Sequence, residues 1–235
     1  KENKGKEILR KLIKNSDVLI ENSRVGTMDK LGFGYKDVKK INPKVIYCSI
    51  TGFGTDGPYA KRGGFDLIAQ GMSGLMSITG HPDSPPAKVG VPIADLNTGM
   101  FAMQGILSAY IHRLKNNEGQ YLEVSLLESA LAYTMYESSI YFTTGKISTP
   151  DGSAHRLTAP YQAFKTMDGY INIGAANQSN WERLTKVLGI ETLNDNPEFS
   201  DSKNRQINRI KLEKILEEIF ITKSSKEWIN ILIDN

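Results

Sequence analysis

The strongest hydrophobic periodicity lies between residues 88 and 109, in the stretch KVGVPIADLNTGMFAMQGILSA. Apolar side chains recur there at intervals of three and four residues, which predicts a long helix with one buried face. The positions of that face are Leu96, Met100, Met103 and Leu107. Asp95 directly precedes them, where an N-cap residue is expected. Two interpretations of Asp95 stay open here. It is a cap that satisfies backbone N–H groups, or a carboxylate nucleophile fixed at the start of a buried helix.

Short apolar runs in the first half predict buried strands of a parallel sheet. They cover residues 18–20 and 45–50, and a partly alternating run at 121–124 predicts a third strand. Helical patterns lie before and between them, at 4–15, 27–31 and 35–41. Strand, turn, helix and strand in this order is the rhythm of a βαβ unit. Ligands of such sheets bind beyond the carboxyl ends of the strands.

Later segments predict longer helices and a smaller second domain. Helices are expected at 65–76, 125–142, 181–188, 208–219 and 226–232, and an Asp-Gly turn predicts a hairpin at 164–170. The sequence therefore predicts an α/β fold in two domains. A Rossmann-like parallel sheet domain with long helices covers residues 1–143, and a smaller α+β domain covers residues 144–235.

Composition narrows the class of protein. Of the 235 residues, 40% are hydrophobic and 23% are charged, as in ordinary globular proteins. The net charge of +3, with acids and bases interspersed, argues against a nucleic-acid surface and suits an anionic small molecule. The single Cys48 allows no internal disulfide. No run reaches membrane-spanning length and no signal peptide opens the chain, so we expect no membrane partner and a reducing, cytoplasmic compartment.

Most catalytic constellations are missing. The three histidines, His81, His112 and His155, lie far apart, and neither H-E-x-x-H nor C-x-x-C occurs, so no metal site is expected. The G-x-S-x-G elbow of serine hydrolases is also absent. A glycine-rich turn at 52–57 could cradle a phosphate through backbone N–H groups, although such turns are common. Chemistry in this chain would therefore rest on a carboxylate.

Several motifs in a fixed order carry a resemblance to a known family. SDVLIEN is followed by LGFGY, NPKVIYCSITGFG, FDLIAQGMSGLM, VGVPIADLNTGMFA and GQYLEVSLLESALA, and then by AH and PYQAFKTMDGY. This order, over nearly the whole chain, resembles the class III CoA-transferases. That family also contains formyl-CoA and carnitine-CoA transferases and α-methylacyl-CoA racemase. The last segment is most similar to that of the succinyl-CoA-dependent dicarboxylate members.

The resemblance implies a set of site residues. Asp95, followed by Gly99, matches the nucleophilic aspartate of the family. The segments that contact CoA match Asn22, Ser23, Arg24 and Lys30 for adenosine and phosphates, and Gly63, Gly64 and Phe65 for pantetheine. His155 and Arg156 lie in a later loop that would suit a second carboxylate, although a solvated loop is the plainer interpretation of His155.

Departures from the family pattern bear on function. The racemase branch carries a catalytic histidine at the position of Phe65, and a phenylalanine cannot exchange a proton, which favours transfer over racemisation. Val25 replaces the usual proline, and residues 153–157 stand where some transferases have a tetraglycine lid. The first strand and the last segment of the family have no counterpart. We therefore expect a fragment, a truncated form of the interlocked homodimer fold.

The expected reaction follows from the resemblance and from carboxylate chemistry. An aspartate with an ordinary pKa of about 3.9 is ionised at neutral pH without a base. CoA would move between small carboxylic acids through an aspartyl–acyl anhydride and an aspartyl-CoA thioester on Asp95. Acyl-CoA and carboxylates are the expected partners, and coenzyme A is the expected cofactor. The alternatives are an acyl-CoA racemase or epimerase of the same superfamily, and a non-catalytic CoA-binding fragment.

Overall fold

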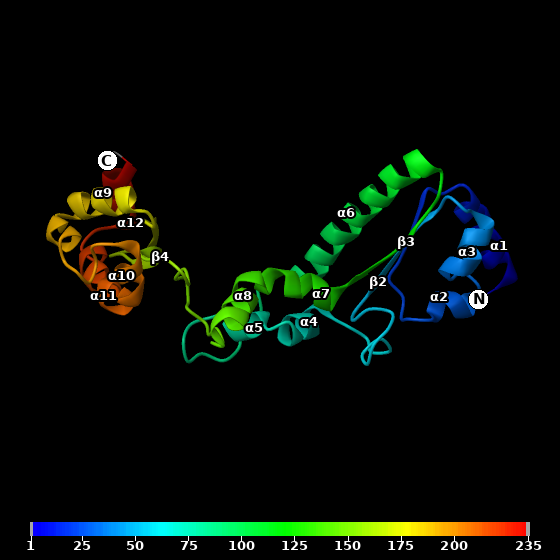
Figure 1. Cartoon of the computed structure of the whole chain (residues 1–235), viewed down its shortest axis with the longest axis horizontal. Helices are drawn as coiled ribbons and strands as arrows, with labels where there is room; N and C mark the ends of the chain where they lie inside the picture. Colours follow the sequence, from blue (N-terminus) through cyan, green and yellow to red (C-terminus); the bar gives the residue numbers. More distant parts are fainter. Residues whose placement is uncertain (1, 234–235) are drawn as a thin grey trace. The chain divides into compact units, whose positions relative to one another are not determined.

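The computed structural model describes residues 2–233, which form two compact units (Figure 1). The first unit runs to Gly80 and resumes from Ser84 to Pro150, and the second takes His81–Asp83 and the chain from Asp151. The predicted α/β class is confirmed, because a parallel sheet with long and short helices forms the first unit. The roles predicted for the two domains stay predictions.

A three-stranded parallel sheet lies at the centre of the first unit. β1 (Val18–Glu21), β2 (Ile46–Thr51) and β3 (Tyr121–Ser125) are arranged in the order β1-β2-β3. The middle strand is buried, as its continuous apolar run predicts. The burial predicted for β1 is wrong in part, because Ile20 is 57% exposed. β1 is an edge strand of the sheet. The long helix α6 (Ile93–Asn116) packs mainly on β2 and β3, so it leaves Ile20 of β1 exposed.

Short helices cover one face of the sheet. α1 (Asn3–Lys14), α2 (Thr27–Leu31) and α3 (Tyr35–Ile41) pack their apolar side chains with Leu19 of β1 and Tyr47 of β2. The buried residues of this cluster are Ile13, Phe33, Val38, Val45 and Tyr47. Both α2 and α3 have their predicted bounds. The loop that joins β1 to α2 therefore leaves the sheet at the carboxyl end of β1.

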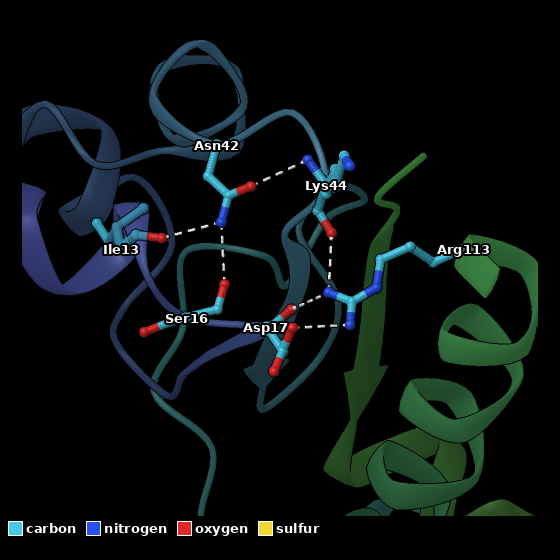
Figure 2. A network of polar contacts seen from close by, with 6 residues as sticks. All are labelled: Ile13, Ser16, Asp17, Asn42, Lys44 and Arg113. Atoms are coloured by element: carbon cyan, nitrogen blue, oxygen red, sulfur yellow. Dashed lines mark hydrogen bonds and ion pairs between the residues drawn. The ribbon is translucent and has the colours of Figure 1, made fainter. Parts of the chain in front are cut away.

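The longest helix, α6 (Ile93–Asn116), packs along β2 and β3. Gly105 allows a close approach, since a Cβ there would lie 3.4 Å from Leu122 Cδ1. Near the end of α6, the Arg113 guanidinium donates to the carbonyl oxygens of Asp17 and Lys44 at 3.2 Å each (Figure 2). It also pairs with the Asp17 carboxylate at 2.8 Å. The end of α6 is thereby fastened to the residues that precede β1 and β2.

Asn42 completes this network (Figure 2). Its amide group donates to the carbonyl oxygens of Ile13 at 3.0 Å and Ser16 at 2.9 Å, and its own oxygen accepts from the Lys44 N–H at 3.1 Å. The starts of β1 and β2 are thus held together at the C-terminal end of α6. Since α6 runs back along the strands, its first turn, which carries Asp95, lies toward their carboxyl ends.

Two predicted helices are interrupted. The segment at 65–76 forms α4 (Asp66–Met72) and α5 (Leu75–Ile78), because Gly74 with φ of 86° ends the helical path. The segment at 125–142 forms α7 (Leu126–Leu131), a 3₁₀ turn (Ala132–Thr134) and α8 (Met135–Thr144). The helices α4, α5, α6 and α7 share a small core. Its buried residues are Ala69, Leu75, Ala94, Leu126 and Ala130.

The face of α6 predicted to be buried is exposed in this chain. Leu96, Met100, Met103 and Leu107 are 48–55% exposed, and Ile111 and Leu114 continue the same row. We call these six residues the α6 apolar row. The buried positions are instead the small residues Ala94, Thr98, Ala102 and Ala109. The spacing correctly identified an apolar face, but periodicity does not tell which face packs on the sheet.

The second unit is an antiparallel hairpin packed with helices. β4 (Tyr161–Lys165) pairs with β5 (Tyr170–Gly174), which confirms the predicted hairpin. The helices are α9 (Gln178–Leu188), a 3₁₀ turn (Glu191–Asn194), α10 (Ser202–Ile207), α11 (Arg209–Phe220) and α12 (Ser225–Ile233). α10 was not predicted. The core contains Phe164, Trp181, Leu216, Phe220 and Trp228.

The Arg113 network gives a test of the first unit. Arg113→Ala removes three charge-assisted hydrogen bonds and is expected to lower the free energy of unfolding by about 2 kcal/mol. Lys115→Ala in the same last turn is the matched control, because Lys115 is exposed. Urea unfolding measures both variants. Equal stability of the two would show that the network does not hold α6 to the sheet.

Candidate active site

A cavity of about 170 Å³ opens where β1 and β2 end. Its lining combines the segment after β1, the end of β2 and the segment before α4. Six residues predicted to contact CoA lie on it together: Asn22, Ser23, Arg24, Gly63, Gly64 and Phe65. The two segments are about forty residues apart in the sequence, and the parallel sheet brings them to one edge.

Hydrogen bonds hold the segment after β1 against the sheet. The Asn22 amide donates to the Ile50 carbonyl oxygen of β2 at 2.8 Å. The Ser23 N–H donates to the Glu21 carboxylate at 2.8 Å, and that carboxylate also accepts from the Ser49 hydroxyl. Since both strand ends contribute, the segment at residues 22–24 is held in place against the sheet.

The glycine-rich loop after β2 is held in a similar way. The Thr51 hydroxyl accepts from the Gly54 N–H at 2.9 Å, and the Glu123 carboxylate of β3 accepts from the backbone and hydroxyl of Thr55. The loop crosses the segment before α4 at very short range. A Cβ built on Gly64 would lie 2.5 Å from Gly52 Cα, so the crossing requires glycine. Gly52, Gly63 and Gly64 therefore line the cavity with backbone alone, and we call this part of the lining the backbone floor.

Two arginine side chains give the cavity a positive charge. Arg24 and Arg62 both line it and both are exposed. The Arg62 guanidinium lies 4.3 Å from the centroid of the Tyr59 ring, which orients it. Two guanidinium groups beside a backbone floor suit an anionic ligand with phosphate groups.

A second cavity of about 390 Å³ shares Arg24 and Val25 with the first. It is lined on the sheet side by Glu21, Ser49, Tyr47 and Tyr121. The pKa of Tyr47 is raised by burial and, secondarily, by the negative charges of Glu21 and Asp29. These tyrosines therefore stay protonated at neutral pH, and a ligand that reaches past Arg24 would meet neutral rings.

Asp95 lies in the first turn of α6, two residues after Ile93, which begins the helix. The predicted N-cap position is wrong, because Pro92 occupies it and offers no side-chain cap. Asp95 is exposed. The pKa of its carboxyl is raised, first by partial desolvation and second by the negative charge of Asp66. The nucleophile interpretation requires an accessible oxygen, and Asp95 offers one.

A hydrogen bond between α4 and α6 connects the turn that carries Asp95 with the cavity wall. Phe65 lines the cavity, and the carboxylate of the next residue, Asp66, accepts a hydrogen bond of 2.9 Å from the Ala94 N–H. Ala94 directly precedes Asp95. Phe65 of the cavity wall and Asp95 are thus each the direct neighbour in sequence of a residue that forms this hydrogen bond.

Three predicted residues lie elsewhere in the chain: Lys30 in α2, and His155 and Arg156 in the second unit. Lys30 lies on the exposed side of α2 and does not line either cavity. The His155 Nδ1 accepts from the Leu157 N–H at 3.1 Å, and Arg156 pairs at 2.8 Å with Asp151, which also pairs with Arg209.

Sequence reasoning missed Asp66, Gln70 and Arg62. The signal for the first two was present in FDLIAQ, where an acid and an amide stand four residues apart on one helix face. Within residues 2–233, no three histidine, cysteine or carboxylate residues gather as a metal-binding group. None of the helices in that same range combines the length and apolarity needed to cross a membrane.

Comparison with known proteins identifies the family. The family described as CoA-transferase family III matches residues 1–235. This chain belongs to CoA-transferase family III, so the resemblance seen in its motifs is confirmed.

Individual relatives agree with this assignment. The chain is similar to a succinate–glutarate CoA-transferase of Agrobacterium fabrum, at 38% identity over 90% of this chain and 53% of that protein. It is equally similar to human succinyl-CoA:glutarate CoA-transferase, at 38% identity over 97% of this chain and 52% of that protein. A crystal structure of a CAIB/BAIF family protein from Brucella suis matches 99% of this chain and 62% of its own, with a TM-score of 0.85 and 38% identity. The chain thus spans about half the length of the curated relatives it matches.

The glycine crossing gives a matched pair of variants. Gly64→Ala places a Cβ 2.5 Å from Gly52 Cα, whereas a Cβ on the neighbouring Gly63 would meet nothing within 4 Å. Gly64→Ala is therefore expected to lower the free energy of unfolding by about 1–3 kcal/mol, as overpacking does. Gly63→Ala is expected to leave it nearly unchanged. Thermal unfolding of both proteins tests this, and equal midpoints would contradict the crossing.

Proposed function

We propose that this chain carries the acyl-CoA site of a CoA-transferase that moves CoA between carboxylic acids, with Asp95 as the nucleophile. The observation that supports this most is the hydrogen bond from Ala94 to Asp66. It connects the accessible carboxylate of α6 with a cavity that has a backbone floor and two arginines. Membership of CoA-transferase family III supports the same reaction class.

The proposed reaction proceeds through two covalent states. A carboxylate oxygen of Asp95 attacks the thioester carbonyl carbon, the carbon–sulfur bond breaks, and CoA leaves as a thiolate. The thiolate then attacks Cγ of the aspartyl–acyl anhydride, which releases the first acid and leaves an aspartyl-CoA thioester. The incoming carboxylate attacks that thioester and again expels the thiolate. Attack of the thiolate on the new acyl carbonyl releases the new acyl-CoA and restores Asp95. Splitting one transfer into these steps lowers each barrier.

The raised pKa of Asp95 fits a nucleophilic role. A carboxylate with a raised pKa is more basic and hence a better nucleophile while it is still ionised at neutral pH. The accessible position of Asp95 allows a thioester to reach it. Below the pKa of Asp95 the attacking form is lost, so the rate of transfer should fall on the acid side.

CoA itself would occupy the cavities at the sheet edge. Arg24 and Arg62 would bind phosphate groups, and the backbone of Gly63 and Gly64 would pass along the pantetheine, next to Phe65. Asn22 and Ser23 would shape the entry, and Lys30 on α2 would bind a phosphate outside the cavity. Because Arg24 lines both cavities, a long ligand could extend from one into the other.

The acids exchanged are proposed to be dicarboxylates. The relatives named above are transferases of succinate and glutarate, and others are named for oxalate and mesaconate. The loop of the second unit that carries His155 and Arg156 is proposed to bind a substrate carboxylate, and Arg156 there already pairs with Asp151. We propose a cytoplasmic location for the reaction.

The racemase alternative has less support at this site. Phe65 is 76% exposed and lines the cavity, where the racemase branch would need a proton-exchanging side chain. A hydrocarbon ring cannot take a proton from the α-carbon of an acyl-CoA.

A second copy of the chain is proposed to cover the α6 apolar row. Six apolar side chains follow one face of α6 from Leu96 to Leu114, which spans about 27 Å at 1.5 Å per residue. Such a row lying open to solvent marks an interaction site. A two-fold axis would place the row against its own copy, with apolar side chains on both sides.

Asp95→Ala in the full-length protein tests the nucleophile. It is expected to lower kcat for transfer from succinyl-CoA by about 1,000-fold or more, because no attacking oxygen remains. With wild-type protein, hydroxylamine should trap a hydroxamate at Asp95 that peptide mass spectrometry detects. A panel of mono- and dicarboxylic acids identifies the acceptor in the same assay.

The stability of an Asp95 variant shows whether its loss of transfer comes from the missing nucleophile or from misfolding. A raised pKa means that the folded state favours protonated Asp95. That contribution to stability is present below about pH 4 and is lost as the pH rises through the raised pKa. Asp95→Asn should therefore not destabilise the protein at neutral pH. Glu118→Gln, an exposed acid beyond the far end of α6, is the control.

Full transfer by Asp95→Ala would exclude Asp95 as the nucleophile. Exchange of the α-proton of an acyl-CoA without any acceptor acid would favour the racemase.

The proposed dimer is tested on full-length protein by light scattering after gel filtration. Leu107→Glu puts a charge in the α6 apolar row and is expected to convert dimer to monomer at micromolar concentration. Ser108→Glu is the control, because the next residue lies about a quarter-turn away from the row. A dimer that persists in Leu107→Glu would show that another surface joins the copies.

A further inference from the structure

The segment that leads into α6 is held by two side chains of α4. The Gln70 side-chain oxygen accepts from the Val89 N–H at 2.8 Å, and the Asp66 carboxylate accepts from the Ala94 N–H at 2.9 Å. Between these two contacts, the Gln70 amide donates to the second oxygen of Asp66 at 2.7 Å. Both ends of the segment from Val89 to Ala94 are thereby bound to one short helix.

This arrangement replaces a missing helix cap. The first N–H groups of a helix have no partner within the helix, and a side chain at the N-cap usually accepts from one of them. Pro92 holds the N-cap position of α6 and has no group to do so. Asp66 accepts instead, from a different helix. The start of α6 therefore depends on α4 for its position.

Gln70 fixes the geometry of these three hydrogen bonds, which we call the Asp66–Gln70 network. It is completely buried, so both ends of its amide must find partners within the protein. Its oxygen serves Val89 and its nitrogen serves Asp66, which fixes the orientation of the amide. Loss of either partner would leave a buried polar group unsatisfied.

We propose that Asp66 and Gln70 are positioning residues that hold the Asp95 carboxylate in line with the acyl-CoA. Asp66 holds the residue next to Asp95, and Gln70 holds Asp66 and the far end of the segment. This proposal rests on the proposed function, since it assigns a role relative to the Asp95 nucleophile. Neither side chain takes part in bond making.

The charge of Asp66 adds an electrostatic effect that a neutral support would lack. Asp66 acts on Asp95 through its negative charge and contributes to the raised pKa. Other charges near this end of α6 have partners: Lys88 Nζ contacts the carbonyl oxygens of Val89 and Gly90, and Glu128 on α7 accepts from the Ser125 hydroxyl. The pH dependence of transfer should therefore respond to Asp66.

The network allows a reciprocal exchange of amide and acid. Asp66→Asn sets two amide NH₂ groups against each other, and Gln70→Glu sets two carboxylates against each other. The double variant D66N/Q70E restores every contact. The new amide at position 66 accepts from Ala94 and donates to the new carboxylate at position 70, which accepts from Val89. The negative charge meanwhile moves from beside Ala94 to beside Val89.

The experiment measures transfer by the full-length protein and its variants. Each single variant is expected to lose about 100-fold in kcat, the order of loss expected from misplacing a reacting group by about 1 Å. The double variant should recover to within about tenfold of the wild type. The acid limb of its profile of kcat against pH should lie at lower pH, because the raised pKa of Asp95 has two causes, partial desolvation and the charge of Asp66, and the second has moved away. Glu118→Gln should change neither value.

Each outcome decides the proposal. Recovery of kcat together with the shifted acid limb supports positioning of Asp95 by Asp66 and Gln70. Single variants with wild-type kcat would overturn it. So would a double variant that regains the thermal midpoint but not kcat, since the network would then be structural only. Failure of the proposed function is detected separately, by transfer that survives in Asp95→Ala.

Discussion

The place of Asp95 relative to the cavity depends on the hydrogen bond that the Asp66 carboxylate accepts from the Ala94 N–H. Asp66 begins α4 directly after the cavity wall, and Ala94 belongs to the first turn of α6. A helix start without its own cap is thereby placed beside the sheet edge that can bind an anionic ligand. That contact, together with the small core that α4 and α6 share, holds the accessible carboxylate close to the cavity wall.

The geometry at both ends of α6 explains why this contact can be precise. Arg113 fastens the far end of the helix to the residues before β1 and β2, and small residues let its buried face lie close to β2 and β3. A helix held at its end and along its side has little freedom to shift its first turn. The field of the helix start favours a negative charge at Asp95, while partial burial and Asp66 oppose it. Partial burial and Asp66 together outweigh the field of the helix start, so the Asp95 carboxylate is more basic than that of an ordinary aspartate.

Much of this site could be predicted from the sequence, for residues 22–24 from the end of the first strand and for residues 63–65 from the resemblance to the family. Asn22 to Arg24 follow β1 directly, and the glycines at 63 and 64 follow the turn after β2, so a parallel sheet brings them together. Asp95 was found through its place before a long periodic run. The support for Asp95 was not found, because a hydrogen bond between α4 and α6 joins residues 28 positions apart and leaves no periodic signal. The break at Gly74 and the exposure of Leu107 were missed for a related reason: spacing reports a face, but tertiary contacts decide where a helix ends and what covers it.

The central claim is that the first turn of α6 brings an aspartate oxygen to the end of bound CoA. The most direct measurement is a crystal structure of the full-length protein with CoA, read for the distance from the Asp95 carboxyl group to the CoA sulfur. The account predicts that pantetheine passes Gly63 and Gly64 and that the sulfur lies about 3–3.5 Å from the carboxyl group, as in a near-attack geometry. A sulfur bound elsewhere, with the Asp95 carboxylate facing only solvent, would contradict it.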